Sequence, residues 1–160
     1  MRVFTSFEEL AAATGESLGP GPWQRVEQSR VDLFADATDD HQWIHIDPVR
    51  ASAGPFGGTI AHGYLTLSLL PALASGLYRV EGVGMGVNYG LNRVRFPAPL
   101  RVGASVRATA TIADVSPVSG GVQLVVTVTV ESDSGGKPVC VAETVSRLYP
   151  AAGATGSPVR

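Results

Sequence analysis

The sequence predicts a single α+β domain in which a long, curved antiparallel sheet wraps a central apolar helix. Two patterns in the 160 residues predict this arrangement. The apolar residues at 61–78 surround the helix axis, which requires burial on nearly every side. From Val83 onward apolar and polar residues alternate, as in strands with one packed face. Because those strands are the only elements large enough to cover the helix, we expect one domain over residues 1–150.

The composition favours a folded chain that binds neither nucleic acid nor membrane. Hydrophobic residues make up 44% of the chain and charged residues 16%, so we expect part of the surface to be covered by oligomerisation. The formal net charge of −2 provides no cationic footprint for nucleic acid. The N-terminus lacks a signal pattern and polar residues interrupt the apolar stretch. We therefore expect a reducing, cytoplasmic setting and a buried, inert Cys140.

The N-terminal part of the chain alternates helix starts with loops. Ser6, followed three residues later by Glu9, has capping-box spacing and predicts a short helix. A short strand is expected at residues 23–27. Ser29 and Asp32 repeat the cap signal and predict a second helix.

Two further helices are expected in the middle of the chain. Asp47 and Pro48 form a good N-cap and first-turn pair, which predicts a brief helix through Ala53. The apolar helix follows at 61–78, where Pro71 removes one backbone hydrogen bond and predicts a kink.

The C-terminal half has the pattern of an antiparallel meander. Glycine-rich turn signals at 120–121 and 134–136 separate its alternating runs. The expected strands are 101–114, 122–132 and 138–149. The glycine run at 82–86 superficially resembles a dinucleotide loop, but it follows a helix and predicts a turn into the next strand. We expect the small-residue tail at 151–160 to be disordered.

The polar cluster at residues 39–47 is the outlier of the sequence, and we expect residues 39–46 to be irregular and not helical. Acid–base chemistry needs a group that titrates near neutrality and a second group that orients or complements it. Asp40 and His45, five positions apart across a turn, could bring a carboxylate and an imidazole to one water molecule. Their spacing alone leaves a solvated or capping role open.

The neighbours of this pair have simpler explanations. Asp39 could close the preceding helix or sit in solvent, and Asp47 is explained as the cap before Pro48. A metal site built from His41, His45 and Asp47 is conceivable, but the spacing is not that of a compact zinc ligand set. We therefore expect no metal.

The start of the apolar helix, at His62 and Gly63, is the second candidate site. Free N–H groups at a helix N-terminus can donate to a developing oxyanion, and Gly63 has no side chain to keep a carbonyl away. Gly63 could also serve tight helix–sheet packing, and His62 could cap or pack.

Taken in order, these motifs resemble those of the MaoC-like dehydratases, a family that includes the (R)-specific enoyl-CoA hydratases. The family pattern of Asp, four residues and His is matched by Asp40 and His45, and its His-Gly by His62 and Gly63. The segment 88–100 resembles the strand and Phe-x-x-Pro stretch that follows the family's helix. The run Asp-His-Gln-Trp-Ile-His is most similar to the NodN-like branch, which includes mycobacterial 3-hydroxyacyl-thioester dehydratases. The resemblance covers residues 4–149.

The resemblance implies a hotdog fold, a homodimer, and an acyl thioester of CoA or acyl carrier protein as substrate. It implies that Asp40 and His45 share one water over a trans-2-enoyl thioester, and that the Gly63 N–H binds the thioester oxygen. Gln42 and His62 are then expected to bind substrate. No cofactor is implied. Many family members have Asn-Pro where this chain has Gln42 and Trp43, so the amide here is one methylene longer and the turn lacks its proline.

Two other functions remain open. A hotdog thioesterase would bind the same thioesters and attack the carbonyl carbon, typically with a carboxylate on the central helix. Residues 59–78 contain no Asp or Glu, which argues against it. A non-catalytic acyl-thioester-binding subunit is the other alternative, and the presence of both Asp40 and His45 counts against it.

Overall fold

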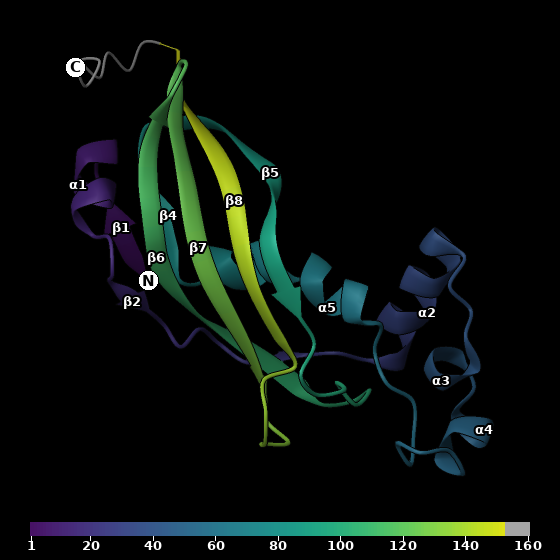
Figure 1. Cartoon of the computed structure of the whole chain (residues 1–160). Helices are drawn as coiled ribbons and strands as arrows, with labels where there is room; N and C mark the ends of the chain where they lie inside the picture. Colours follow the sequence, from purple (N-terminus) through teal and green to yellow (C-terminus); the bar gives the residue numbers. More distant parts are fainter. Residues whose placement is uncertain (153–160) are drawn as a thin grey trace.

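A long antiparallel sheet dominates the fold (Figure 1). The computed structural model describes residues 1–152, so the expected disorder of residues 153–160 lies outside the described part. The long strands run in the order β6-β7-β8-β5, and the short strands β2 and β3 pair with the other edge of β6. The sheet consists of β2 (Ser17–Leu18), β3 (Gln24–Arg25), β5 (Val83–Arg95), β6 (Ser105–Val118), β7 (Gly121–Ser132) and β8 (Cys140–Pro150).

The predicted meander is confirmed, and its register explains the packed face. Ala108 lies opposite Val130, and Ala110 lies opposite Val128. All four are buried, so small residues on β6 face larger ones on β7 and leave room for the helix layer. Gly120 joins the two strands at φ +79°, a conformation that an L side chain rarely adopts. Cys140 is fully buried, as predicted.

The central helix is shorter than predicted and interrupted. It comprises α5 (Gly63–Ser68) and α6 (Leu70–Ser75), separated at Leu69. The interruption lies two residues before Pro71, which cannot donate a backbone hydrogen bond. Residues 78–80 are not helical but form β4 (Tyr78–Val80), which pairs in parallel with β1 (Arg2–Phe4). The sequence analysis missed both short strands.

The expectation that the central helix is buried on nearly every side is wrong for this chain. Its exposed residues recur at helical spacing, because the sheet covers the helix from one side only. They are Tyr64, Ser68, Pro71, Ala72 and Ser75. The opposite side, which includes Leu65 and Leu73, belongs to the main core.

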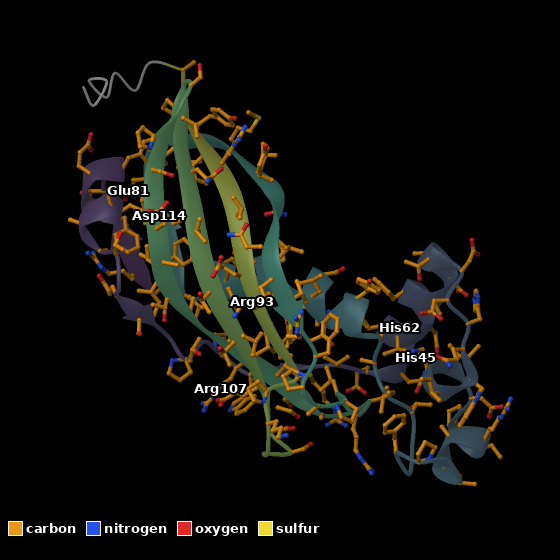
Figure 2. All side chains as sticks on the ribbon, in the orientation of Figure 1. His45, His62, Glu81, Arg93, Arg107 and Asp114 are labelled. Carbon is orange, nitrogen blue, oxygen red and sulfur yellow. The ribbon has the colours of Figure 1, made fainter. Side chains whose placement is uncertain are left out.

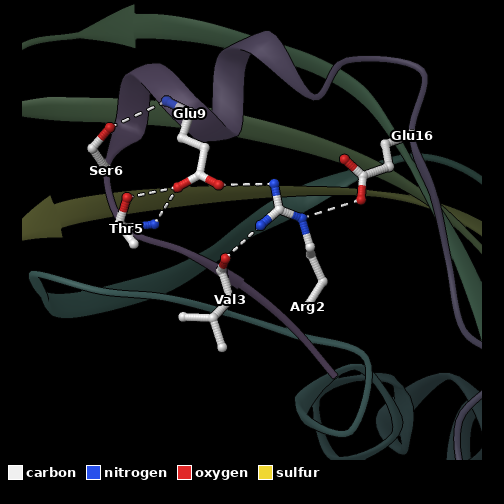
Figure 3. A network of polar contacts seen from close by, with 6 residues as sticks. All are labelled: Arg2, Val3, Thr5, Ser6, Glu9 and Glu16. Carbon is white, nitrogen blue, oxygen red and sulfur yellow. Dashed lines mark hydrogen bonds and ion pairs between the residues drawn. The ribbon is translucent and has the colours of Figure 1, made fainter.

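The N-terminal helix begins as its capping signal predicts. Ser6 caps α1 (Phe7–Ala12) by accepting a hydrogen bond from the Glu9 N–H. The Glu9 carboxylate accepts from the Thr5 N–H and hydroxyl, and it pairs with Arg2 (Figure 3). The Thr5 hydrogen bonds, followed by Arg2, lower the pKa of Glu9 to about 2. These polar contacts link β1 to α1.

Three helices lie together beyond one end of the sheet, next to α5 (Figure 1). They are α2 (Gln28–Thr38), α3 (Trp43–Ile46) and α4 (Pro48–Ser52). The prediction that Ser29 caps α2 is wrong: Glu27 is the N-cap residue, and α2 starts one residue before Ser29. Asp47 caps α4 as expected by accepting from the Arg50 N–H. Across residues 1–152 no helix has the length and apolarity needed to span a bilayer.

Candidate active site

Asp40 lies directly after the end of α2. Asp39 closes that helix in the left-handed conformation, at φ 58°, as one of the two explanations offered for it expected. Asp40 therefore leaves the helix axis and its side chain is exposed. Its backbone carbonyl turns inward and accepts a hydrogen bond from His62 Nε2 at 2.9 Å. The carboxylate thus sits on an anchored backbone.

His45 lies in α3, a single helical turn within the segment that we expected to be irregular. Its ring is buried, with 6% exposed. Nδ1 lies 2.6 Å from the carbonyl oxygen of Ile60. A carbonyl can only accept a hydrogen bond, so Nδ1 carries the proton and the lone pair remains on Nε2. This tautomer leaves Nε2 able to accept a proton.

His62 connects the other two residues. Its ring is 2% exposed and stacks on the ring of His45, with centroids 3.8 Å apart and an interplanar angle of 28°. The ring centroid of Phe34 lies 5.1 Å from that of His62. Nε2 donates to the carbonyl of Asp40, and the buried Nδ1 has no hydrogen-bond partner among residues 1–152. His62 therefore holds the Asp40 backbone and covers one face of the His45 ring.

The three side chains converge at one end of the sheet, where Figure 2 shows His45 and His62 next to each other. One acidic or imidazole atom from each of Asp40, His45 and His62 lies within 4.8 Å of the others. Such a trio could hold a metal ion, because each imidazole uses one nitrogen to donate to a backbone carbonyl and keeps the other for a metal ion or a proton. The geometry also serves proton transfer between a carboxylate and an imidazole.

The alternative metal set weighed from the sequence is not brought together. His41 points to the surface, where its Nε2 lies 2.9 Å from Asp36. The Asp47 carboxylate accepts a hydrogen bond from the Arg50 N–H and so caps α4. Neither residue accompanies His45.

Burial shifts the pKa of the His45 imidazole. Desolvation lowers the pKa of His45, and the neighbouring His62 acts in the same direction. The hydrogen bond to Ile60 and the charge of Asp40 oppose this shift. The net effect favours the neutral imidazole at neutral pH, which is the form that can accept a proton.

Gly63 begins α5 directly beside this cluster. A Cβ atom at this position would lie 2.9 Å from Cδ2 of Phe96, closer than side chains tolerate. The packing explanation for this glycine is therefore confirmed. The N-cap residue His62 makes no side-chain cap bond within the described chain, so the first N–H groups of α5 are not capped.

Comparison with known proteins places this arrangement in a family. The model of the MaoC like domain matches residues 9–135, which is most of the chain. The chain belongs to the MaoC-like family. This MaoC-like domain is 55% identical over 148 residues to 3-hydroxyacyl-thioester dehydratase Z of Mycobacterium tuberculosis, covering 92% of this chain and 98% of that protein. It is 44% identical over 145 residues to nodulation protein N of Rhizobium leguminosarum bv. viciae, covering 88% and 89%.

Solved structures confirm the hotdog fold of this MaoC-like domain. The R-hydratase PhaJ1 from Pseudomonas aeruginosa superposes with a TM-score of 0.71 at 20% identity, covering 96% of this chain and 94% of that one. A monoamine oxidase regulatory protein from Archaeoglobus gives a TM-score of 0.75 at 24% identity, covering 94% and 97%.

Gln42 occupies the position where many family members have asparagine. In this MaoC-like domain it is the N-cap residue of α3, and its carbonyl accepts the His45 N–H at 2.9 Å. Its side chain is exposed and forms no cap bond to α3 in the part of the chain described. The Gln42 side chain therefore faces solvent.

Sequence reasoning missed Gln28, whose side chain forms a hydrogen bond with the backbone of α3. The Gln28 side chain donates to the His45 carbonyl and accepts from the Thr59 hydroxyl. Gln28 and His45 lie 17 positions apart, and Thr59 lies a further 14 positions along the chain. No local pattern joins positions so far apart, since the contact depends on how α2 packs against α3.

Proposed function

We propose that this chain catalyses the hydration of a trans-2-enoyl thioester to a (3R)-3-hydroxyacyl thioester, and the reverse dehydration. The observation that carries the proposal is the buried His45, whose Nδ1–H is fixed on Ile60 while the ring lies beside the Asp40 carboxylate. Its close relative in Mycobacterium tuberculosis is a 3-hydroxyacyl-thioester dehydratase, and a more distant relative in Rhodospirillum rubrum is an (R)-specific enoyl-CoA hydratase. The reaction is that of a hydro-lyase.

The proposed roles follow from the geometry of the pair. In hydration, His45 Nε2 takes a proton from a water molecule while the resulting hydroxide adds to C3 of the enoyl group. Asp40 holds that water and relays to C2 the proton that His45 has taken, so both groups return to their starting protonation states. In dehydration the same groups act in reverse. The neutral state of His45 at neutral pH, favoured by burial, suits the first step.

Gly63 is proposed as the donor that stabilises the enolate. Negative charge develops on the thioester oxygen as water adds, and the uncapped N–H at the start of α5 can donate to it. Loss of such a donor typically costs about 3 kcal/mol of transition-state stabilisation. Gln42, whose side chain is exposed, is proposed to contact the substrate or the bound water. His62 is only 2% exposed, so little of its ring is available for a substrate contact.

We further propose that the chain acts as a homodimer joined through β5. This strand lies at an edge of the sheet and exposes several large apolar side chains, with bulges in its pairing with β8 that place Leu91 on the other face from Met85 and Val87. The exposed apolar side chains are Met85, Val87, Tyr89 and Leu91. A long apolar edge strand invites pairing with another chain. Leu91→Lys should shift the sedimentation coefficient toward the monomer, whereas Leu33→Lys, at an exposed leucine of α2, should not.

The experiment that tests the activity follows the conjugated absorbance of crotonyl-CoA, with chiral analysis of the product. Asp40→Asn and His45→Gln should each lower kcat by at least about 10²-fold, since general acid–base catalysis typically contributes that much. His41→Gln, at the exposed histidine paired with Asp36, is the matched control and should stay near wild type. No hydration by the wild-type protein at any chain length contradicts the proposal, and release of free thiol would instead identify a thioesterase.

A further inference from the structure

The side-chain amide of Gln28 joins three segments of the chain. Its Nε2 donates to the His45 carbonyl at 2.7 Å and to Asp32 Oδ1 at 2.8 Å. Its Oε1 accepts from the Thr59 hydroxyl at 2.6 Å. The orientation of the amide is fixed, because the carbonyl and the carboxylate can only accept. Three of the four hydrogen bonds that an amide can form are therefore made.

Two of these partners support the His45 ring. The His45 carbonyl lies near the end of α3, a four-residue helix whose last carbonyls have no donor within the helix. A single turn is not stable on its own and depends on outside contacts to keep its geometry. The amide of Gln28 supplies one such contact directly at the residue that carries the base.

The second partner, Thr59, precedes the residue whose carbonyl binds the His45 ring. Thr59 is buried and directly precedes Ile60, whose carbonyl accepts the His45 Nδ1–H. The Ile60 N–H in turn donates to the carbonyl of Ile44, at 3.0 Å. The Gln28 amide thus connects the backbone that carries the imidazole to the segment that fixes its tautomer and direction.

We infer that Gln28 is a positioning residue for the base of this site, a role that rests on the proposed function of His45. Gln28 acts through His45 and has no contact with the reacting atoms in this scheme. Its loss lets α3 and the Ile60 segment move relative to each other. A displacement of about 1 Å of a catalytic group can reduce the rate by about 10²-fold. Substrate binding, which does not depend on the base, should change little.

Two variants of Gln28 separate positioning from general stability. Gln28→Met fills the same space without hydrogen bonds and should lower kcat by about 10- to 100-fold at an unchanged KM. Gln28→Glu keeps the acceptor for Thr59 but places a carboxylate against the His45 carbonyl and Asp32. This charge favours the imidazolium, so the acid limb of the kcat profile should move to higher pH in the Glu variant alone. This shift reports how close residue 28 lies to the imidazole, whereas the lower kcat at unchanged KM in Gln28→Met reports positioning.

The control and the partner variant complete the test. Gln123→Met, at a half-buried glutamine of β7 close to the hairpin with β6, should keep wild-type kcat and KM. Thr59→Val removes only the hydroxyl that orients the amide. It should have a smaller effect than Gln28→Met and add little to it in the double variant.

A readout independent of turnover distinguishes this inference from the proposed function. The Nδ1 proton of His45 should appear in wild-type NMR spectra as a slowly exchanging imidazole resonance, and Gln28→Met should abolish it while Gln123→Met retains it. Wild-type kcat together with a retained resonance in Gln28→Met overturns the inference. If the wild-type protein does not hydrate any enoyl thioester, the proposed function fails, and the resonance alone then decides whether the amide holds His45.

Discussion

Replacement of Gly63 by alanine tests how tightly the start of α5 is packed. The new Cβ would lie 2.9, 3.0 and 3.1 Å from three carbons of the Phe96 ring. Carbon atoms in contact prefer about 3.5–4.0 Å, so the ring must move by roughly 0.5–1 Å. Overpacking of this kind costs about 1–3 kcal/mol. Because Phe96 is 40% exposed and can yield toward solvent, the lower part of that range applies.

An opposing contribution comes from the backbone. Gly63 is not among the glycines with positive φ, so alanine is not strained there. Alanine also favours a helix over glycine by up to about 1 kcal/mol in helix interiors, and by less at a first position. The balance is a loss of about 1 kcal/mol in the free energy of unfolding.

Urea unfolding in two backgrounds measures this balance. Gly63→Ala should lower the midpoint without changing the m-value. In a Phe96→Ala background, where the obstructing ring is absent, the same substitution should be neutral or stabilising. The hydration rate should be lower in Gly63→Ala than in the wild-type protein. The double variant should hydrate as fast as Phe96→Ala alone. An equal cost in both backgrounds, or a gain in the wild-type background, would refute the packing argument.

Three further outcomes follow from the structure. Burial lowers the pKa of His45 in the folded protein. The neutral imidazole therefore contributes stability above the pKa of an unfolded histidine, about 6.5, and this contribution is lost as the pH falls toward the pKa of the folded protein. His45→Gln should flatten the curve of unfolding free energy against pH in that range. Desolvation raises the pKa of the Cys140 thiol to about 11, so Ellman's reagent at pH 8 should label the native protein far more slowly than the urea-unfolded protein. Asp47→Ala removes the cap of α4 and should cost about 1 kcal/mol in urea unfolding, whereas Asp47→Asn should retain most of that stability.

The sheet could be predicted because each of its long strands buries one face. In β6, Val106, Ala108, Ala110 and Ile112 are buried and alternate with less buried residues, and the sequence carries that period directly. The short strands were missed for the opposite reason. β1 and β4 contain three residues each, and their pairing joins positions that lie more than 70 residues apart. So short a run carries no period that distinguishes a strand from a loop.

The residues of the candidate site were partly predictable from the sequence, but the hydrogen bonds that hold them in place were not. The spacing of Asp40 and His45 suggested one shared water, and the structure brings the two side chains together. What orients the imidazole is the carbonyl of Ile60, and what holds Asp40 in place is its own carbonyl bonded to His62. Any residue type presents a carbonyl, so side-chain identity gives no signal for such contacts.

Because the histidines are oriented by main-chain carbonyls, the geometry of the site depends on the path of the backbone at residues 59–61. That path is fixed by a short bridge to the segment before β6: the Ala61 N–H donates to Leu100 at 2.8 Å, and the Val102 N–H donates to Thr59 at 3.0 Å. The Gln28 amide fastens the same segment to α3 from the other side. The imidazole of His45 is therefore held through the segment before β6 on one side and through α2 on the other. Substitutions at Ile60 that keep the backbone in place should spare the tautomer of His45, whereas a change at Gln28 or Thr59 alters the position of that backbone relative to α3.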